Sequence, residues 1–140
     1  MIKKIDHIGI AVKNLDDALN MYREVYKLKA IKVERLEDLK IRIAFIPLGE
    51  VLIELLEPTE PGEGRIGKFV EENGEGFHHI AYRVDDIDQT MLGLRQANIL
   101  LRDTRPRDGG DNSRIAFIEP GFTQNVLTEL VERKREVIGE

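Results

Sequence analysis

The chain carries an internal repeat, which constrains its fold more than any other feature of the sequence. The segment DHIGIAVKNLDDA at 6–18 recurs 72 positions later as HHIAYRVDDIDQT, and RIAFI at 42–46 recurs unchanged at the same offset. VLIELLE at 51–57 recurs 75 positions later as VLTELVE, so the second copy has gained three residues before its last strand. A period of about seventy residues is too long for a solenoid. We therefore predict a duplicated half-domain that closes its core only as a pair.

Each copy is predicted to contain a strand, a helix and three further strands. In the first copy, alternating apolar residues and turn signals predict strands at 3–12, 28–34, 40–48 and 50–57. The helix is expected to begin after Asn14, an N-cap residue with an acidic residue three positions on. Its predicted apolar face consists of Leu15, Ala18, Leu19, Tyr22, Val25 and Tyr26.

The second copy follows the same order, with a linker before it and a charged segment after it. Its strands are predicted at 78–84, 99–102, 113–118 and 125–132. Its helix is expected to be capped by Asp85 or Asp86 and to run to about Ala97. The linker begins with a Pro- and Gly-rich loop and is predicted to form a short helix over 65–73.

The predicted fold class is α+β, with two tandem βαβββ modules whose curved sheets pair around a central metal-binding cavity. All 140 residues are assigned to one domain. Within it, the first module covers 1–57, the linker 58–77, the second module 78–132 and a solvated charged tail 133–140.

Composition excludes several classes of function. The absence of Cys excludes disulfides, thiolate-ligated zinc and thiol catalysis, and is typical of a reducing compartment. A net charge of −5 argues against a nucleic-acid partner. Asp6 and His7 interrupt any apolar signal-peptide core, and no apolar run approaches membrane-spanning length. We expect a cytoplasmic protein with no membrane or nucleic-acid partner.

Four potential metal ligands occupy matching positions in the two copies. His7 corresponds to His79, and Glu54 corresponds to Glu129. A single strand His is usually a hydrogen-bonded core residue, and a single strand Glu usually faces solvent. Four such residues in register instead favour a divalent metal site, and two imidazoles with two carboxylates suit Mn, Co, Ni, Zn or Fe(II) alike. Strand alternation turns His78 away from this set and gives it a structural role.

These segments resemble the vicinal-oxygen-chelate (glyoxalase/dioxygenase) superfamily, whose paired βαβββ modules carry an H…E/Q…H…E metal site. DHIGIAV, ELLEP at 54–58, NGEGFHHIAYRVDDID at 73–88 and VLTEL at 126–130 are most similar to its methylmalonyl-CoA epimerase family. The resemblance implies metal ligands at the two His and two Glu residues, an acyl-CoA substrate and a homodimer.

The resemblance also implies a reaction. The α-proton of a 2-branched acyl-CoA would be removed while a divalent metal stabilises charge on the thioester carbonyl. Glu129 would handle the proton, and Glu54 would act on the opposite face. Ile43 stands where several family members place a second carboxylate base, and Glu119-Pro120-Gly121 replaces the family's HPK turn. Residues 109–113 form either a mobile loop over the substrate or a plain hairpin connection.

Three other functions remain open. A glyoxalase I-type lactoylglutathione lyase uses the same four ligands on a hemithioacetal. A metal-free small-molecule binding protein keeps the fold without the ligands, so the intact set argues against it. A ring-cleaving dioxygenase typically uses two His and one Glu around Fe(II), and a second Glu would crowd its open site.

Overall fold

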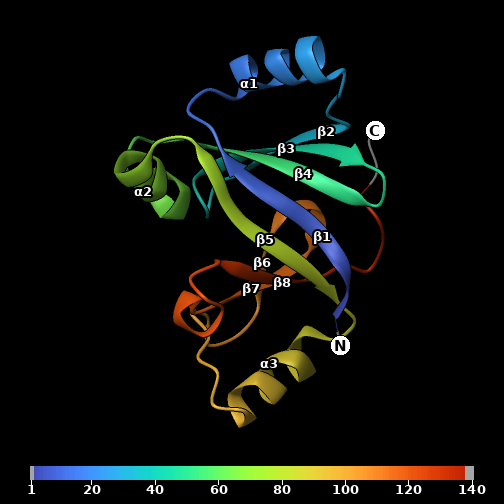
Figure 1. Ribbon diagram of the computed structural model, residues 1–140, viewed down its shortest axis with the longest axis vertical. Coiled ribbons are helices and arrows are strands. Elements are labelled where there is room, and N and C mark those ends of the chain that lie inside the picture. The colour runs from blue at the N-terminus through green and yellow to red at the C-terminus, as the bar shows by residue number, and fades with distance from the viewer. Residues whose placement is uncertain (1, 138–140) are drawn as a thin grey trace. The chain divides into compact units, whose positions relative to one another are not determined.

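The structure, a computed structural model, describes residues 2–137 and shows the βαβββ order twice (Figure 1). The first copy contains β1 (Ile2–Ala11), α1 (Leu15–Met21), β2 (Lys32–Leu36), β3 (Ile41–Leu48) and β4 (Val51–Pro58). After α2 (Gly64–Asn73), the second copy contains β5 (Gly76–Val84), α3 (Ile87–Gln96), β6 (Arg107–Asp108), β7 (Arg114–Ile118) and β8 (Thr128–Glu132). The α+β class and the duplicated module are confirmed.

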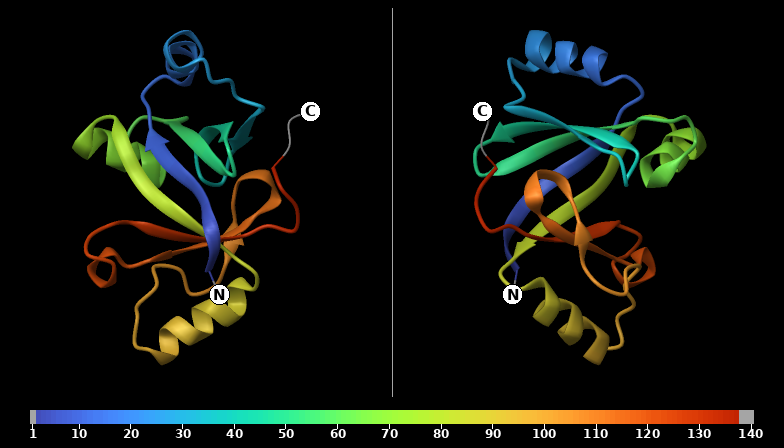
Figure 2. Two further views of the ribbon diagram at one scale, coloured as in Figure 1. Left: turned by 45° about the vertical axis from the view of Figure 1, so that its right-hand side comes forward. Right: turned by 180° about the vertical axis from the view of Figure 1, so that it is seen from behind.

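The chain divides into two compact units that share strands β1 and β5. Unit one contains the part of β1 that ends at His7, together with His79–Val137, whereas unit two is Ile8–His78. The hydrogen-bonded strand order is β1-β5-β8-β7-β6 in unit one and β2-β3-β4-β1 in unit two. The right-hand view of Figure 2 shows β2, β3 and β4 side by side. The first copy of the repeat thus supplies a strand segment to the unit that the second copy builds.

Each unit holds one of the two predicted carboxylates, on a strand that is paired with its neighbours. In unit one, Glu129 on β8 lies opposite Ala81 of the parallel strand β5 and opposite Phe117 of the antiparallel strand β7. In unit two, Glu54 on β4 lies opposite Phe45 of β3. Both glutamates are therefore on strands with paired neighbours, where their side chains are buried.

Each unit has its own apolar core between a helix and the sheet. In unit one, Ile87 and Met91 of α3 are fully buried against β7 and β8, as the apolar stripe of this helix predicts. In unit two, Leu15 of α1 is fully buried against Ala44, Ile46 and other residues of β3 and β4. Packing of one helix on each strand set holds the strands that carry the polar residues.

Both predicted helix caps are present. The side chain of Asn14 accepts a hydrogen bond from the backbone N–H of Asp17 at 3.0 Å, and Asp86 accepts one from the N–H of Gln89 at 3.1 Å. Of the two candidates for the second cap, the structure selects Asp86. Each cap satisfies an N–H that has no partner inside its helix.

Two sequence-based predictions are wrong. Residues 99–102 do not form a strand, because only Leu101 makes a bridge, to Ile118, and Asp103 Oδ2 accepts the hydrogen bond of the Phe117 N–H. The strand β6 pairs with the start of β7, at Arg114 and Ile115. Val25 and Tyr26 are exposed and do not continue the apolar face of α1. A π-helical turn over Tyr22–Tyr26 replaces the last α-turn and changes the angular spacing of the residues that follow Met21.

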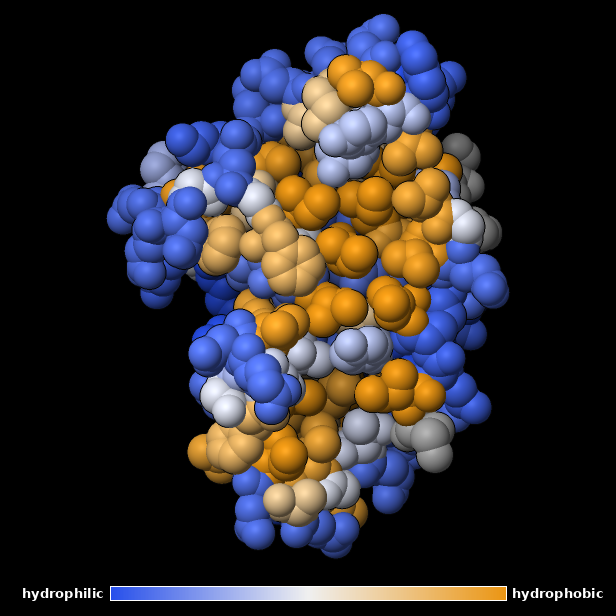
Figure 3. All heavy atoms as spheres, viewed as in Figure 1, coloured by the Kyte–Doolittle hydropathy of each residue, from blue (hydrophilic) through white to orange (hydrophobic). Residues whose placement is uncertain are grey.

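Apolar side chains also lie on the surface of the shared strands. Ile2 and Ile5 of β1, in unit one, are exposed, and so is Phe77 of β5, in unit two. Figure 3 shows apolar atoms at the surface of the molecule. Within residues 2–137, no helix is both long and apolar enough to cross a membrane.

Candidate metal centre and active site

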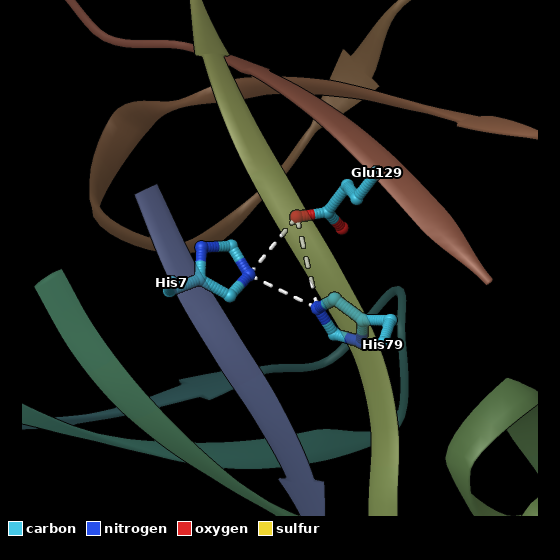
Figure 4. A group of neighbouring side chains, drawn as sticks. All are labelled: His7, His79 and Glu129. Carbon is cyan, nitrogen blue, oxygen red and sulfur yellow. Dashed lines mark hydrogen bonds and ion pairs between the residues drawn. The ribbon is translucent and has the colours of Figure 1, made fainter. Parts of the chain in front are cut away.

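Three of the four predicted ligands meet inside unit one. His7 on β1, His79 on β5 and Glu129 on β8 direct their polar atoms at one point (Figure 4). The His7 Nε2 atom lies 3.0 Å from His79 Nε2 and 3.0 Å from Glu129 Oε1, and His79 Nε2 lies 3.8 Å from the same oxygen. Each residue is at most 4% exposed. We call these three residues the triad.

The distances and the chemistry of the triad fit a divalent cation. Two ligand atoms that each lie about 2.1 Å from a metal, at right angles to each other, are about 3.0 Å apart. Two imidazole nitrogens and a carboxylate oxygen form the mixed donor set of Mn, Co, Ni, Zn and Fe(II) sites. A buried carboxylate facing two imidazoles also needs a positive charge to offset its lost hydration. The triad residues are therefore able to hold such a metal.

A buried carboxylate orients the first imidazole. Asp6 Oδ1 lies 2.6 Å from His7 Nδ1, and Asp6 is 1% exposed. A carboxylate accepts and never donates when ionised, so this contact assigns the ring proton to Nδ1. A metal would bind through the lone pair of His7 Nε2, which faces the triad. Carboxylate–histidine pairs of this kind fix the orientation of ligating histidines in metal sites.

Hydrogen bonds from His7 and Arg133 keep Asp6 ionised. Burial alone would raise the pKa of this carboxyl, but hydrogen bonds from His7 and Arg133, together with their charges, outweigh burial and hold the pKa far below its ordinary value. Arg133 donates to both Asp6 oxygens, each at 3.0 Å, and Arg83 Nε donates to Oδ2 at 2.7 Å. The acceptor of the His7 ring proton is thus a permanent anion.

Packing against β7 helps to position the second imidazole. The rings of His79 and of Phe117 on β7 pack in a T-shaped arrangement, with centroids 5.5 Å apart and planes at 87°. Ala81 follows on the same face of β5 and is fully buried. A small residue beside the ring and an aromatic residue against it leave His79 free to face His7.

The remaining predicted residues lie in unit two. Glu54 is buried in the middle of β4, so its side chain does not face solvent, and its membership of the ligand set stays a prediction. Ile43 is buried on β3 and offers no base. His78 packs against Phe69 of α2, with ring centroids 4.8 Å apart, in the structural role that strand alternation predicts.

The segment Gly109–Ser113 is a packed connection between β6 and β7. Gly109 N–H donates to the Ser113 carbonyl at 2.9 Å, and Asp111 and Ser113 are buried. A Cβ on Gly109 would lie 2.7 Å from Ile115 and from Ser113 Oγ, so the loop closes tightly against the sheet. Of the two interpretations offered by the sequence, the structure supports the hairpin connection.

Sequence reasoning missed the residues that support His7. Asp6 precedes His7 directly, and this adjacency was the available signal for an orienting carboxylate. Arg83 lies four residues after His79 on β5. Arg133 falls in the segment predicted to be a solvated tail, yet its side chain is 2% exposed. The prediction of a solvated 133–140 is therefore wrong at Arg133, and 138–140 lie outside the described residues.

The family model of the Glyoxalase/Bleomycin resistance protein/Dioxygenase superfamily matches residues 6–117, and the chain belongs to this superfamily. The uncharacterized protein YqjC of Bacillus subtilis is 37% identical over 133 residues, covering 95% of this chain and 94% of the relative. An ethylmalonyl-CoA/methylmalonyl-CoA epimerase of Cereibacter sphaeroides is 33% identical, covering 93% of this chain and 98% of the relative.

A solved structure shows the same fold. The methylmalonyl-CoA epimerase of Streptomyces coelicolor, in complex with 2-nitronate-propionyl-CoA, superimposes with a TM-score of 0.92. It is 34% identical to this chain, and the match covers 97% of this chain and 98% of the epimerase. Named epimerases thus match this chain over nearly its whole length in both sequence and fold.

Proposed function

We propose that the chain is an epimerase of 2-branched acyl-CoA thioesters of the methylmalonyl-CoA type. The observation that carries this proposal is the meeting of His7, His79 and Glu129 in the buried interior of unit one. Relatives named as epimerases of such thioesters match over more than nine tenths of this chain. The expected reaction is removal of the proton α to the thioester carbonyl and its return on the opposite face.

Four residues are proposed to hold one divalent metal ion: His7, Glu54, His79 and Glu129. A bound metal would supply Lewis-acid stabilisation of the negative charge that develops on the thioester oxygen. The two imidazoles contribute neutral donors, and Asp6 keeps the lone pair of His7 on Nε2. The two carboxylates balance the charge of the cation, so the filled site is close to neutral. The metal is proposed to be Co, Mn, Ni, Zn or Fe(II).

Glu129 is proposed to take the α-proton. Its carboxylate is buried, which strengthens its electrostatic interactions, and one oxygen already lies 3.0 Å from His7 Nε2. Glu54 is proposed to serve the opposite face of the substrate, because it is the residue that the duplication pairs with Glu129. Ile43 supplies no second base, so both proton transfers fall to these two carboxylates.

The direct test is exchange of the substrate α-proton with solvent deuterium. Purified protein with each of several divalent metals is incubated with methylmalonyl-CoA in deuterium oxide, and label at the α-carbon is followed by mass spectrometry. We expect exchange with the wild type and loss of exchange in Glu129→Ala, whereas the surface variant Glu119→Gln retains it. Exchange by folded Glu129→Ala would remove Glu129 from the mechanism.

The same preparation distinguishes an epimerase from the two alternative functions. A glyoxalase I-type lyase would convert the adduct of methylglyoxal and glutathione and would leave the acyl-CoA unlabelled. A metal-free binding protein would do neither and would retain no divalent metal after reconstitution. Either result would replace the epimerase proposal.

We also propose that the protein acts as a homodimer. The exposed apolar residues at the start of β1 in unit one, Ile2 and Ile5, support an interface there, because exposed apolar residues often mark contact surfaces. Sedimentation of the wild type and of Ile5→Glu tests this proposal, with a dimer expected for the first and a monomer for the second.

A further inference from the structure

The side chain of Arg133 is buried next to Asp6 and His7, although the two residues that follow it in sequence are exposed. Its side chain is 2% exposed, whereas Lys134 and Arg135 are exposed. Burying an arginine is costly unless each donor of the guanidinium finds an acceptor. The structure supplies those acceptors: Nε and Nη2 donate to Asp6 Oδ2 and Oδ1, each at 3.0 Å, and Nη1 donates to the Gly110 carbonyl at 3.0 Å.

One of the two Asp6 oxygens that accept a hydrogen bond from Arg133 also contacts His7. Asp6 Oδ1 accepts from Arg133 Nη2 and contacts His7 Nδ1 at 2.6 Å. A two-pronged contact between a guanidinium and a carboxylate fixes the plane of the carboxylate as well as its position. The direction of the His7 ring is therefore set by a carboxylate whose orientation Arg133 determines.

Arg83 contributes less to this arrangement. It makes one contact with Asp6, from Nε to Oδ2 at 2.7 Å, and its two terminal nitrogens bind the exposed carboxylate of Glu136. Arg83 neutralises charge but reaches only the oxygen that does not contact His7. Of the two arginines, only Arg133 therefore contacts the Asp6 oxygen that faces His7.

We propose that Arg133 is a positioning residue for His7. With Asp6 it holds the His7 proton on Nδ1 and directs Nε2 to the triad, and its contact with Gly110 anchors this pair to the β6–β7 connection. The proposal concerns the orientation of His7 and rests on the proposed function only where His7 is taken as a metal ligand. Lysine at this position keeps the charge but has a single nitrogen, so it cannot make the two-pronged contact with the Asp6 carboxylate.

The first test reads the His7 ring in metal-free protein. Long-range nitrogen–proton NMR of histidine-labelled protein distinguishes a protonated Nδ1 from a protonated Nε2. We expect a proton on His7 Nδ1 throughout the wild-type sample, partial loss of this Nδ1 proton in Arg133→Gln and a smaller loss in Arg133→Lys. Arg135→Gln changes an exposed arginine two residues away and should match the wild type.

The second test measures affinity for Co²⁺ by calorimetric titration of the same variants. Loss of a group that orients a metal ligand typically weakens binding by about 10- to 100-fold. We expect that range for Arg133→Gln, a smaller loss for Arg133→Lys and no change for Arg135→Gln or Glu136→Gln. Where Arg133→Gln does not fold, Arg133→Lys decides the question.

The two tests separate this proposal from the proposed function. If folded Arg133 variants keep both the His7 tautomer and the Co²⁺ affinity of the wild type, Arg133 only stabilises the fold and the positioning role is wrong. A wild-type His7 with its proton on Nε2 overturns the positioning role as well. Absence of epimerase activity in the wild type leaves the metal-free NMR result unaffected, and overturns only the proposed function.

Discussion

Glu57 and Glu132 perform the same task in the two copies of the repeat. Glu57 accepts the backbone N–H of Leu15 at 2.7 Å, and Glu132 accepts that of Ile87 at 2.9 Å, so each carboxylate satisfies the first N–H of a helix. Each also binds an arginine of the neighbouring strand, Arg42 or Arg114. The duplication has preserved the connection between helix and sheet as well as the candidate ligands.

Removing either carboxylate should destabilise its unit. Glu57→Ala and Glu132→Ala each leave a helix N–H and an arginine without this acceptor, which is expected to lower the free energy of unfolding by about 1–3 kcal/mol. Urea unfolding followed by circular dichroism measures the loss. The exposed first-turn acids provide matched controls, and Asp16→Ala and Asp88→Ala should cost less than about 1 kcal/mol. Equal losses in all four variants would contradict this prediction.

Divalent metal should stabilise the protein through His79. Binding to the folded state alone contributes about 2.7 kcal/mol at a hundredfold excess over the dissociation constant, which corresponds to a rise of about 10 °C in Tm. We expect this rise on adding Co²⁺ to the wild type and its absence in His79→Ala. His78→Ala alters the adjacent ring, which packs on Phe69, and should keep the response. A response retained in His79→Ala would exclude His79 as a ligand.

Substitutions at Glu54 test whether a fourth ligand completes the site. Glu54→Gln keeps an oxygen donor and is expected to bind Co²⁺ more weakly than the wild type but more tightly than Glu54→Ala. For Glu54→Ala, the dissociation constant should rise by at least about tenfold. Titration calorimetry measures both, with the exposed Glu37→Ala as control. An unchanged constant in Glu54→Ala would restrict the ligand set to the triad of unit one.

Alkaline pH should destabilise unit two through Tyr22. Burial, assisted by the charge of Tyr26, raises the pKa of the Tyr22 phenol above its ordinary value of 10.0. The folded state therefore retains this proton more strongly than the unfolded chain, so the contribution of Tyr22 is complete below pH 10 and is lost as pH rises through the raised pKa. Unfolding free energies from pH 8 to 11 should fall less steeply in Tyr22→Phe than in the wild type. Parallel curves would contradict the prediction.

Features that depend on residues close in sequence were predicted correctly. Asn14 and Asp86 each cap a helix because the donor lies three residues away. The repeat also indicated that His7, His79 and Glu129 would meet, because it places equivalent residues on equivalent strands. Periodicity and duplication were therefore sufficient for the fold and for much of the candidate site.

Features that depend on distant side chains could not be predicted. The segment 99–102 has the composition of a strand. However, Asp103 Oδ2 accepts a hydrogen bond from the N–H of Phe117 at 2.8 Å, and so occupies part of the edge of β7 where a strand would pair. Its neighbours in sequence assign Arg133 to a charged tail. Its partner Asp6 lies 127 residues earlier, and local sequence carries no signal for that contact.

The division of β1 between the two units has a consequence for the origin of the site. His7 comes from the first copy of the repeat, whereas His79 and Glu129 come from the second, yet all three lie in unit one. An ancestral chain with a single copy would have carried one histidine and one glutamate of this set. It would have assembled the same three residues only by placing its first strand in the sheet of a second molecule, and gene fusion would have joined the two copies in one chain.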